Sequence, residues 1–223
     1  MKKLVIFLIF SSFVSSELVL EITQGTDDPY RVAILPFKGE KKLSSDIENI
    51  VINNLKRSGE FTVFIATDLL SVPKNEEEIV FNDFRILNID YLVLGSINNG
   101  DVFYEVYDIK KGLKIRSSTV FGIPNKIRQL AHYVTDGIYE EITGIKGIAA
   151  TKILYVTQSD KYSLVVADSD GENEQILLES SEPIISPSWS PDSKKVAYVS
   201  FETGMAKVFI QNIATGEREV VVE

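Results

Sequence analysis

The chain has 223 residues, of which 44% are apolar and 25% charged, and its formal net charge at pH 7 is −9. This length allows one large domain or two ordinary ones, each with a core of its own. The acidic balance argues against a nucleic-acid backbone as the main partner, because that binding needs clustered Lys and Arg. The sequence contains no cysteine, which excludes disulfides and thiol chemistry.

The first sixteen residues have the pattern of an export signal. Lys2 and Lys3 precede an apolar run over residues 4–10, and small residues follow up to Ser16. A secretory signal combines a positive start, a short apolar stretch and small residues at the cleavage site. We therefore expect cleavage after Ser16, with Glu17 as the mature N-terminus, and a periplasmic location. An uncleaved anchor is the alternative, although the apolar run is short for a membrane span.

Alternating β-rich and helical stretches predict an α/β domain over residues 17–145, with a mixed sheet covered by helices. The expected strands cover residues 17–23, 31–37, 61–65, 91–97, 102–109 and 113–121. The expected helices cover residues 43–58, 82–87 and 125–143, and residues 68–80 are expected to form a solvated loop.

Local signals mark the ends of these elements. Ser45 and Glu48 have the spacing of a capping box at the start of the first helix. Gly59 and Gly144 are expected to stop the first and last helices. Asn99-Gly100 is a typical tight hairpin turn.

The helical period disappears after a predicted linker over residues 146–151. The strands expected over 153–157 and 196–200 are near copies, 43 residues apart. Each is followed by a turn, a second apolar strand, a turn that contains Gly171 or Gly216, and a third strand. A unit that recurs at this period predicts a β-propeller over residues 152–223, of which about two blades are present.

No residue pattern indicates catalysis, a cofactor or a metal. The glycines form no dinucleotide or phosphate-binding loop, and one histidine without cysteine builds no zinc site. His132 falls away from the apolar face of its helix, so we expect it to be solvated. Asp168 to Gly171 fails as a calcium loop and is expected to be a turn. Trp189, Tyr155 and Tyr198 are interpreted as blade core.

Several stretches resemble the TolB family of the periplasmic Tol-Pal system. They are Val32–Phe37, Ile89–Gly95, Glu141–Gly147, Ser186–Asp192, Lys195–Val199 and Phe201–Gly204. In the last blade, Ser193 stands where the family's repeat usually has Gly. The family's propeller has six blades, so the resemblance implies a C-terminally truncated sequence, with Glu219–Val222 as an apolar edge strand open to pairing.

The resemblance implies a non-enzymatic scaffold with two protein partners and a role in envelope integrity, outer-membrane constriction at division and bacteriocin uptake. The C-terminal domain of TolA would be bound by the extreme N-terminus, which here is Glu17, Leu18, Val19, Leu20 and Glu21. A short β-prone terminus can add as a strand to a partner's sheet, or tuck against its own domain. A plain edge strand is the alternative for this segment.

Pal, an outer-membrane lipoprotein, would be bound by the propeller and would keep the protein peripheral to that membrane. The family's main Pal-contact positions lie on blades that this sequence lacks, so no residue is assigned to Pal. We expect weak or absent Pal binding if the chain ends at Glu223. Two further hypotheses are the propeller part of a secreted hydrolase, which a Gly-x-Ser-x-Gly motif would distinguish, and a generic secreted propeller adaptor.

Overall fold

The computed structural model describes residues 28–122 and 126–222. The predicted signal peptide, its cleavage site at Ser16 and the strand expected over residues 17–23 lie outside the described residues.

The first half of the described chain forms a five-stranded sheet with the order β2-β1-β3-β4-β5. β1 is parallel to β2 and to β3, and β3, β4 and β5 form antiparallel hairpins, so the sheet is mixed as predicted. The strands are β1 (Tyr30–Ile34), β2 (Phe61–Phe64), β3 (Tyr91–Asn98), β4 (Asp101–Asp108) and β5 (Leu113–Val120). We call this sheet and its helices the N-terminal domain.

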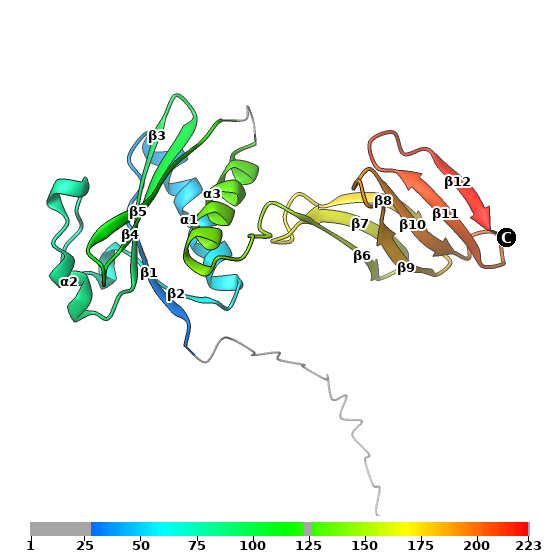
Figure 1. Cartoon of the computed structure of the whole chain (residues 1–223). Coiled ribbons are helices and arrows are strands. Elements are labelled where there is room, and N and C mark those ends of the chain that lie inside the picture. The colour runs from blue at the N-terminus through cyan, green and yellow to red at the C-terminus, as the bar shows by residue number, and fades with distance from the viewer. Residues whose placement is uncertain (1–27, 123–125, 223) are drawn as a thin grey trace, which may run out of the picture.

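Helices cover both faces of this sheet (Figure 1). α1 (Lys41–Arg57) and α3 (Ile127–Thr143) pack on one face, where Val32 and Ile34 of β1 point. The short α2 (Phe81–Ile86) lies over the other face, onto which Ala33 and Leu35 point. Two single 3₁₀ turns follow β2: η1 (Ala66–Asp68) ends at the first residue of the segment expected to be loop, and η2 (Glu76–Glu78) lies within that segment. Because successive side chains of a strand alternate between covered faces, β1 is apolar almost throughout.

The predicted capping box of α1 is wrong. The helix begins at Lys41, before Ser45, and Glu40 caps it without a side-chain bond. Glu48 lies within the helix, and its Oε2 accepts a hydrogen bond from the Phe37 backbone N–H at 3.1 Å. The Glu48 carboxylate therefore binds the segment that follows β1. The Ser45–Glu48 spacing alone does not reveal this contact.

The predicted turns are confirmed by backbone geometry. Asn99 and Gly100 have φ of 52° and 88°, as the two central residues of a type I′ hairpin turn require. Gly144 ends α3 with a left-handed φ of 73°.

The second half of the described chain is all β and forms two antiparallel sheets, with the orders β6-β7-β8 and β12-β11-β10-β9. We call them blade 1 and blade 2. Blade 1 consists of β6 (Lys152–Gln158), β7 (Tyr162–Asp168) and β8 (Gln175–Ser180). Blade 2 consists of β9 (Ile184–Trp189), β10 (Lys195–Ser200), β11 (Lys207–Asn212) and β12 (Arg218–Val222).

Equivalent hydrogen bonds confirm the repeat that the sequence predicts. The Ser169 N–H donates to the Thr151 carbonyl at 3.1 Å, and in blade 2 the Ile213 N–H donates to Lys194 at the same distance. The turn glycines match as well: Gly171 donates to the Asp168 carbonyl and Gly216 to that of Asn212, both at 2.9 Å. The β7–β8 turn is therefore the counterpart of the β11–β12 turn.

The blades pack face to face, and this explains the different fates of two matching tyrosines. Tyr198 is 1% exposed and belongs to a core that β6 enters through Leu154 and Val156. Stacked repeats meet through opposite faces, so the blade 1 residue that matches Tyr198 points away from blade 2. That residue, Tyr155, is only partly buried, and its hydroxyl bonds Glu174 at 2.5 Å. The interpretation as blade core is confirmed for Tyr198 and Trp189 but is wrong for Tyr155.

Within residues 28–122 and 126–222, none of the helices combines the length and the apolar character that a membrane crossing requires.

Candidate functional site at the junction of the two domains

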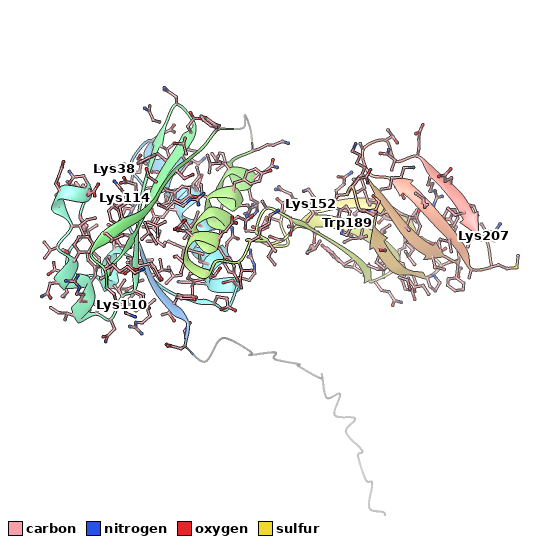
Figure 2. The ribbon with its side chains drawn as sticks, in the orientation of Figure 1. Lys38, Lys110, Lys114, Lys152, Trp189 and Lys207 are labelled. Atoms are coloured by element: carbon pink, nitrogen blue, oxygen red, sulfur yellow. The ribbon has the colours of Figure 1, made fainter. Side chains whose placement is uncertain are left out.

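The N-terminal domain and blade 1 meet at a polar contact built by three segments. These are α3, the linker that follows Gly144, and the β7–β8 turn after Asp168; we call their contact the junction. Figure 1 shows blade 1 next to the helical side of the N-terminal domain. Lys152, labelled in Figure 2, lies where the linker enters β6, and its Nζ is 2.7 Å from Asp168 Oδ1.

Asp136 of α3 holds the linker. Its two carboxylate oxygens accept the backbone N–H groups of Ala149 at 2.7 Å and Ala150 at 3.0 Å. The linker passes so close to the helix that a Cβ on Gly147 would lie 2.6 Å from Asp136 Cα. Ser169 of the β7–β8 turn then donates its hydroxyl to the Ala149 carbonyl at 2.7 Å. The segment predicted as a linker is therefore fixed to both domains.

Asp170 of the same turn docks on α3. Its carboxylate accepts from the Arg128 guanidinium, which also approaches Glu172 at 3.9 Å. The equivalent turn of blade 2, Ile213 to Gly216, contains no acid, and its backbone bonds the Asn212 side chain instead. The acidic side chain thus distinguishes the one repeat turn that contacts α3.

His132 lies one helical turn from both Arg128 and Asp136, on the stripe of α3 that faces the propeller. The expectation that His132 is solvated is wrong, because the residue is 2% exposed. Position on the polar side of the helix suggests solvent only when nothing covers that side; here α1 and the β7–β8 turn do. Its Nδ1 is 2.8 Å from Asn54 Nδ2 of α1. Its buried Nε2 has no hydrogen-bond partner among the described residues and lies 3.6 Å from Asp170 Oδ2.

Two residues at the junction, His132 and Asp168, have pKa values below their ordinary values. Burial lowers the pKa of His132 below its ordinary value; Asp170 and Asp168 oppose this shift, and Arg128 and Arg57 add to it. Partial burial alone would raise the pKa of Asp168, but bonds from Lys152 and Asn173 outweigh it and lower that pKa. At neutral pH the junction therefore contains a neutral imidazole near the ionised carboxylate of Asp168.

His132, Asp168 and Asp170 bring potential ligand atoms within 4.8 Å of one another. Two cations already neutralise these carboxylates, since Arg128 pairs with Asp170 and Lys152 with Asp168. The Asn54 N–H at Nδ1 also leaves the proton of the neutral imidazole on Nε2, the nitrogen nearest Asp170. This is the arrangement of an ion-paired contact, and we assign no metal to it.

A groove of about 510 Å³ runs beside the junction, between α1, α3 and the linker. Its apolar lining includes Tyr139, Ile145 and Ile148, of which the two isoleucines are 63% and 74% exposed. The charged residues of its lining are Arg57, Asp136 and Lys146.

Two protein-family models match the chain. The TolB amino-terminal domain matches residues 18–115, and the TolB β-propeller domain matches residues 139–223. The chain belongs to the TolB family.

Individual TolB proteins resemble the chain over nearly its whole length. Tol-Pal system protein TolB of Alcanivorax borkumensis is 41% identical over 216 residues, which are 92% of this chain and 50% of that protein. TolB of a Marinomonas species is 40% identical over 230 residues, or 97% of this chain and 53% of that one. The crystal structure of TolB from Acinetobacter baumannii superposes with a TM-score of 0.79 at 36% identity, covering 90% and 51% of the two chains. The chain spans about half the length of the TolB proteins it matches.

The residues predicted to bind TolA, Glu17 to Glu21, lie outside the described residues, so their assignment stays a prediction. Sequence reasoning missed the junction. It placed the β7–β8 turn correctly but gave Asp170 no role, and it placed His132 in solvent. One signal was available: aligning the two repeats sets Ser169-Asp170 against Ile213-Ala214, and the acid has no counterpart there.

Proposed function

We propose that the chain is a non-enzymatic periplasmic scaffold of the Tol-Pal system that links inner-membrane TolA to outer-membrane Pal. The observation that carries this is the 41% identity over 92% of the chain to a protein named for that system. It favours a Tol-Pal role over a generic secreted adaptor. The role in envelope integrity and in constriction at division is part of the same proposal.

The TolA contact is proposed for the segment Glu17 to Glu21. Leu18 and Leu20 alternate with Val19 in a β-prone run, so one face of an added strand would carry both leucines. The described chain begins at the exposed Asp28 and enters β1 two residues later, at Tyr30.

Pal is proposed as the partner of the propeller, with no residue assigned. The junction supports a scaffold that carries partners on two domains, because Asp136, Ser169 and Asp170 fix the blades to the helices of the N-terminal domain.

The TolA assignment is tested by the double substitution Leu18→Asp and Leu20→Asp, with TolA binding measured by isothermal titration calorimetry. We expect affinity to fall at least about tenfold, because two carboxylates replace the apolar face of the added strand.

The matched control is Leu70→Asp with Ile86→Asp, which makes the same chemical change at positions 62% and 63% exposed in the N-terminal domain. This control should bind TolA as the parent does. Unchanged binding by the Leu18/Leu20 variant would show that TolA binds elsewhere.

A further inference from the structure

Hydrogen bonds around His132 fix which of its nitrogens carries the proton. The Thr135 hydroxyl donates to the Ala131 carbonyl at 2.8 Å, so its oxygen accepts from Asn54 Nδ2 at 3.2 Å. Asn54 Oδ1 accepts from the Arg57 guanidinium at 2.6 Å. The Asn54 amide is therefore held with its N–H groups toward His132, whose Nδ1 must accept. A neutral imidazole in this setting carries its proton on Nε2.

A second proton conflicts with this arrangement. It would bind Nδ1 and place two donors 2.8 Å apart. Relief requires the Asn54 amide to turn over, and this breaks its bonds to Arg57 and to Thr135. The β7–β8 turn adds to the conflict in the closed junction, because Nε2 is buried there without a hydrogen-bond partner among the described residues and the Asp170 carboxylate is already paired with Arg128.

Charged groups from every neighbouring element act on the imidazole. α1 contributes Arg57, and α3 contributes Arg128 one turn before His132. The propeller side contributes Asp168 and Asp170, with Lys152 bound to the first and Glu172 near Arg128. Each of the two nearest carboxylates has a cation of its own, so neither is free to compensate a buried imidazolium fully.

We propose that His132 makes the packing of blade 1 against α3 depend on proton binding, with the neutral imidazole favouring the closed junction and the imidazolium favouring an open one. In the open state Asp170 leaves Arg128 and His132 gains water. His132 lies next to the β7–β8 turn. A movement of this turn away from α3 would change the orientation of the blades relative to the N-terminal domain.

The sign follows from linkage. Burial lowers the pKa of His132 in the closed junction, whereas exposure in the open state returns it toward its ordinary value near 6.5. The stability that closure gains from a neutral histidine is present above about pH 6.5 and is lost as the pH falls through the closed-state pKa. Protons therefore favour opening.

A direct test uses the fact that the chain has one histidine. Nitrogen–proton correlation spectra of the imidazole, recorded on the whole chain across the titration, report both its pKa and its tautomer. We expect the Nε2–H tautomer and a midpoint below 6.5. A midpoint at or above 6.5, or a proton on Nδ1 of the neutral ring, would overturn the proposal.

The second test measures domain orientation. The chain has one tryptophan, Trp189 in blade 2, and no cysteine. A fluorescent acceptor on a cysteine introduced as Lys42→Cys in α1 therefore gives a single transfer distance across the junction. We expect constant transfer between about pH 8 and about pH 7, and a change as the pH falls toward about 5. Far-ultraviolet circular dichroism on the same samples separates opening from unfolding.

Two variants at neighbouring positions complete the experiment. His132→Gln should flatten the pH profile, whereas Tyr133→Gln, at a 42% exposed position on the same helix, should leave it unchanged. A parent protein whose transfer does not change with pH, or a His132→Gln variant that keeps the parent's profile, would refute the proposal.

Discussion

Gly147 is the residue on which the linker's path along α3 depends. An added Cβ would lie 2.3 Å from Asp136 Oδ1 and 2.6 Å from Asp136 Cα, and the Cα is part of the helix backbone, which cannot give way easily. We predict that Gly147→Ala destabilises the protein by about 1–3 kcal/mol, the usual cost of overpacking. The linker must move away, so the Ala149 and Ala150 N–H groups also lose Asp136. Urea unfolding measures the effect.

The control for this variant is the adjacent exposed Lys146→Ala, which should stay within about 0.5 kcal/mol of the parent. If Gly147→Ala were as stable as Lys146→Ala, the close approach of linker and helix would not constrain the fold.

At the scale of one element, the β9–β10 hairpin contains a strained turn. Ser193 has φ of 57°, a left-handed value that favours glycine, and its N–H donates to the Ser190 carbonyl at 2.9 Å. This backbone conformation fits the expectation from the resemblance that glycine is usual at this position.

We predict the stability order Ser193→Gly above the parent and the parent above Ser193→Val. Glycine removes about 1–2 kcal/mol of left-handed strain but costs about 0.5–1 kcal/mol of backbone entropy, so the net gain is small. A β-branched side chain adds strain in this conformation. Thermal unfolding of the three proteins gives the order, and equal stability of the valine variant would mean that the turn relaxes out of the left-handed region.

Turns, helix ends and the order of elements could be predicted from the sequence where they depend on residues close together in the chain. The Asn99-Gly100 turn, the Gly144 stop and, within the described residues, the order of strands and helices depend on neighbouring residues, and the structure confirms them. Glu48 and His132 were misjudged because their partners are distant in the chain. Phe37 lies 11 residues from Glu48, and Asn54 lies 78 residues from His132. A polar residue on the outer side of a helix can be placed only when the elements that cover it are known.

At the scale of the whole molecule, the two halves carry separate spectroscopic reporters. Among residues 28–122 and 126–222 the α-helices all belong to the N-terminal domain, whereas the sole tryptophan of the sequence lies in blade 2. Helical circular dichroism therefore follows one half, and Trp189 fluorescence follows the other. If the two signals change together during unfolding, the junction couples the two halves; if they change separately, it does not.

A substitution of Gln211 changes contacts within the blades and leaves the N-terminal domain untouched. It is 3% exposed, accepts from the Tyr198 hydroxyl at 2.9 Å and donates to the Leu177 carbonyl of blade 1 at 3.0 Å. We predict that Gln211→Ala costs the blades about 2–3 kcal/mol, because it leaves a cavity and removes the hydrogen-bond partner of the Leu177 carbonyl and the acceptor of the Tyr198 O–H. The exposed Gln175→Ala is the matched control.

If the junction holds the halves as one cooperative unit, both reporters shift together; a shift in fluorescence alone would show that the halves unfold independently. We expect both to shift, since Asp136, Ser169 and Asp170 bind across the junction.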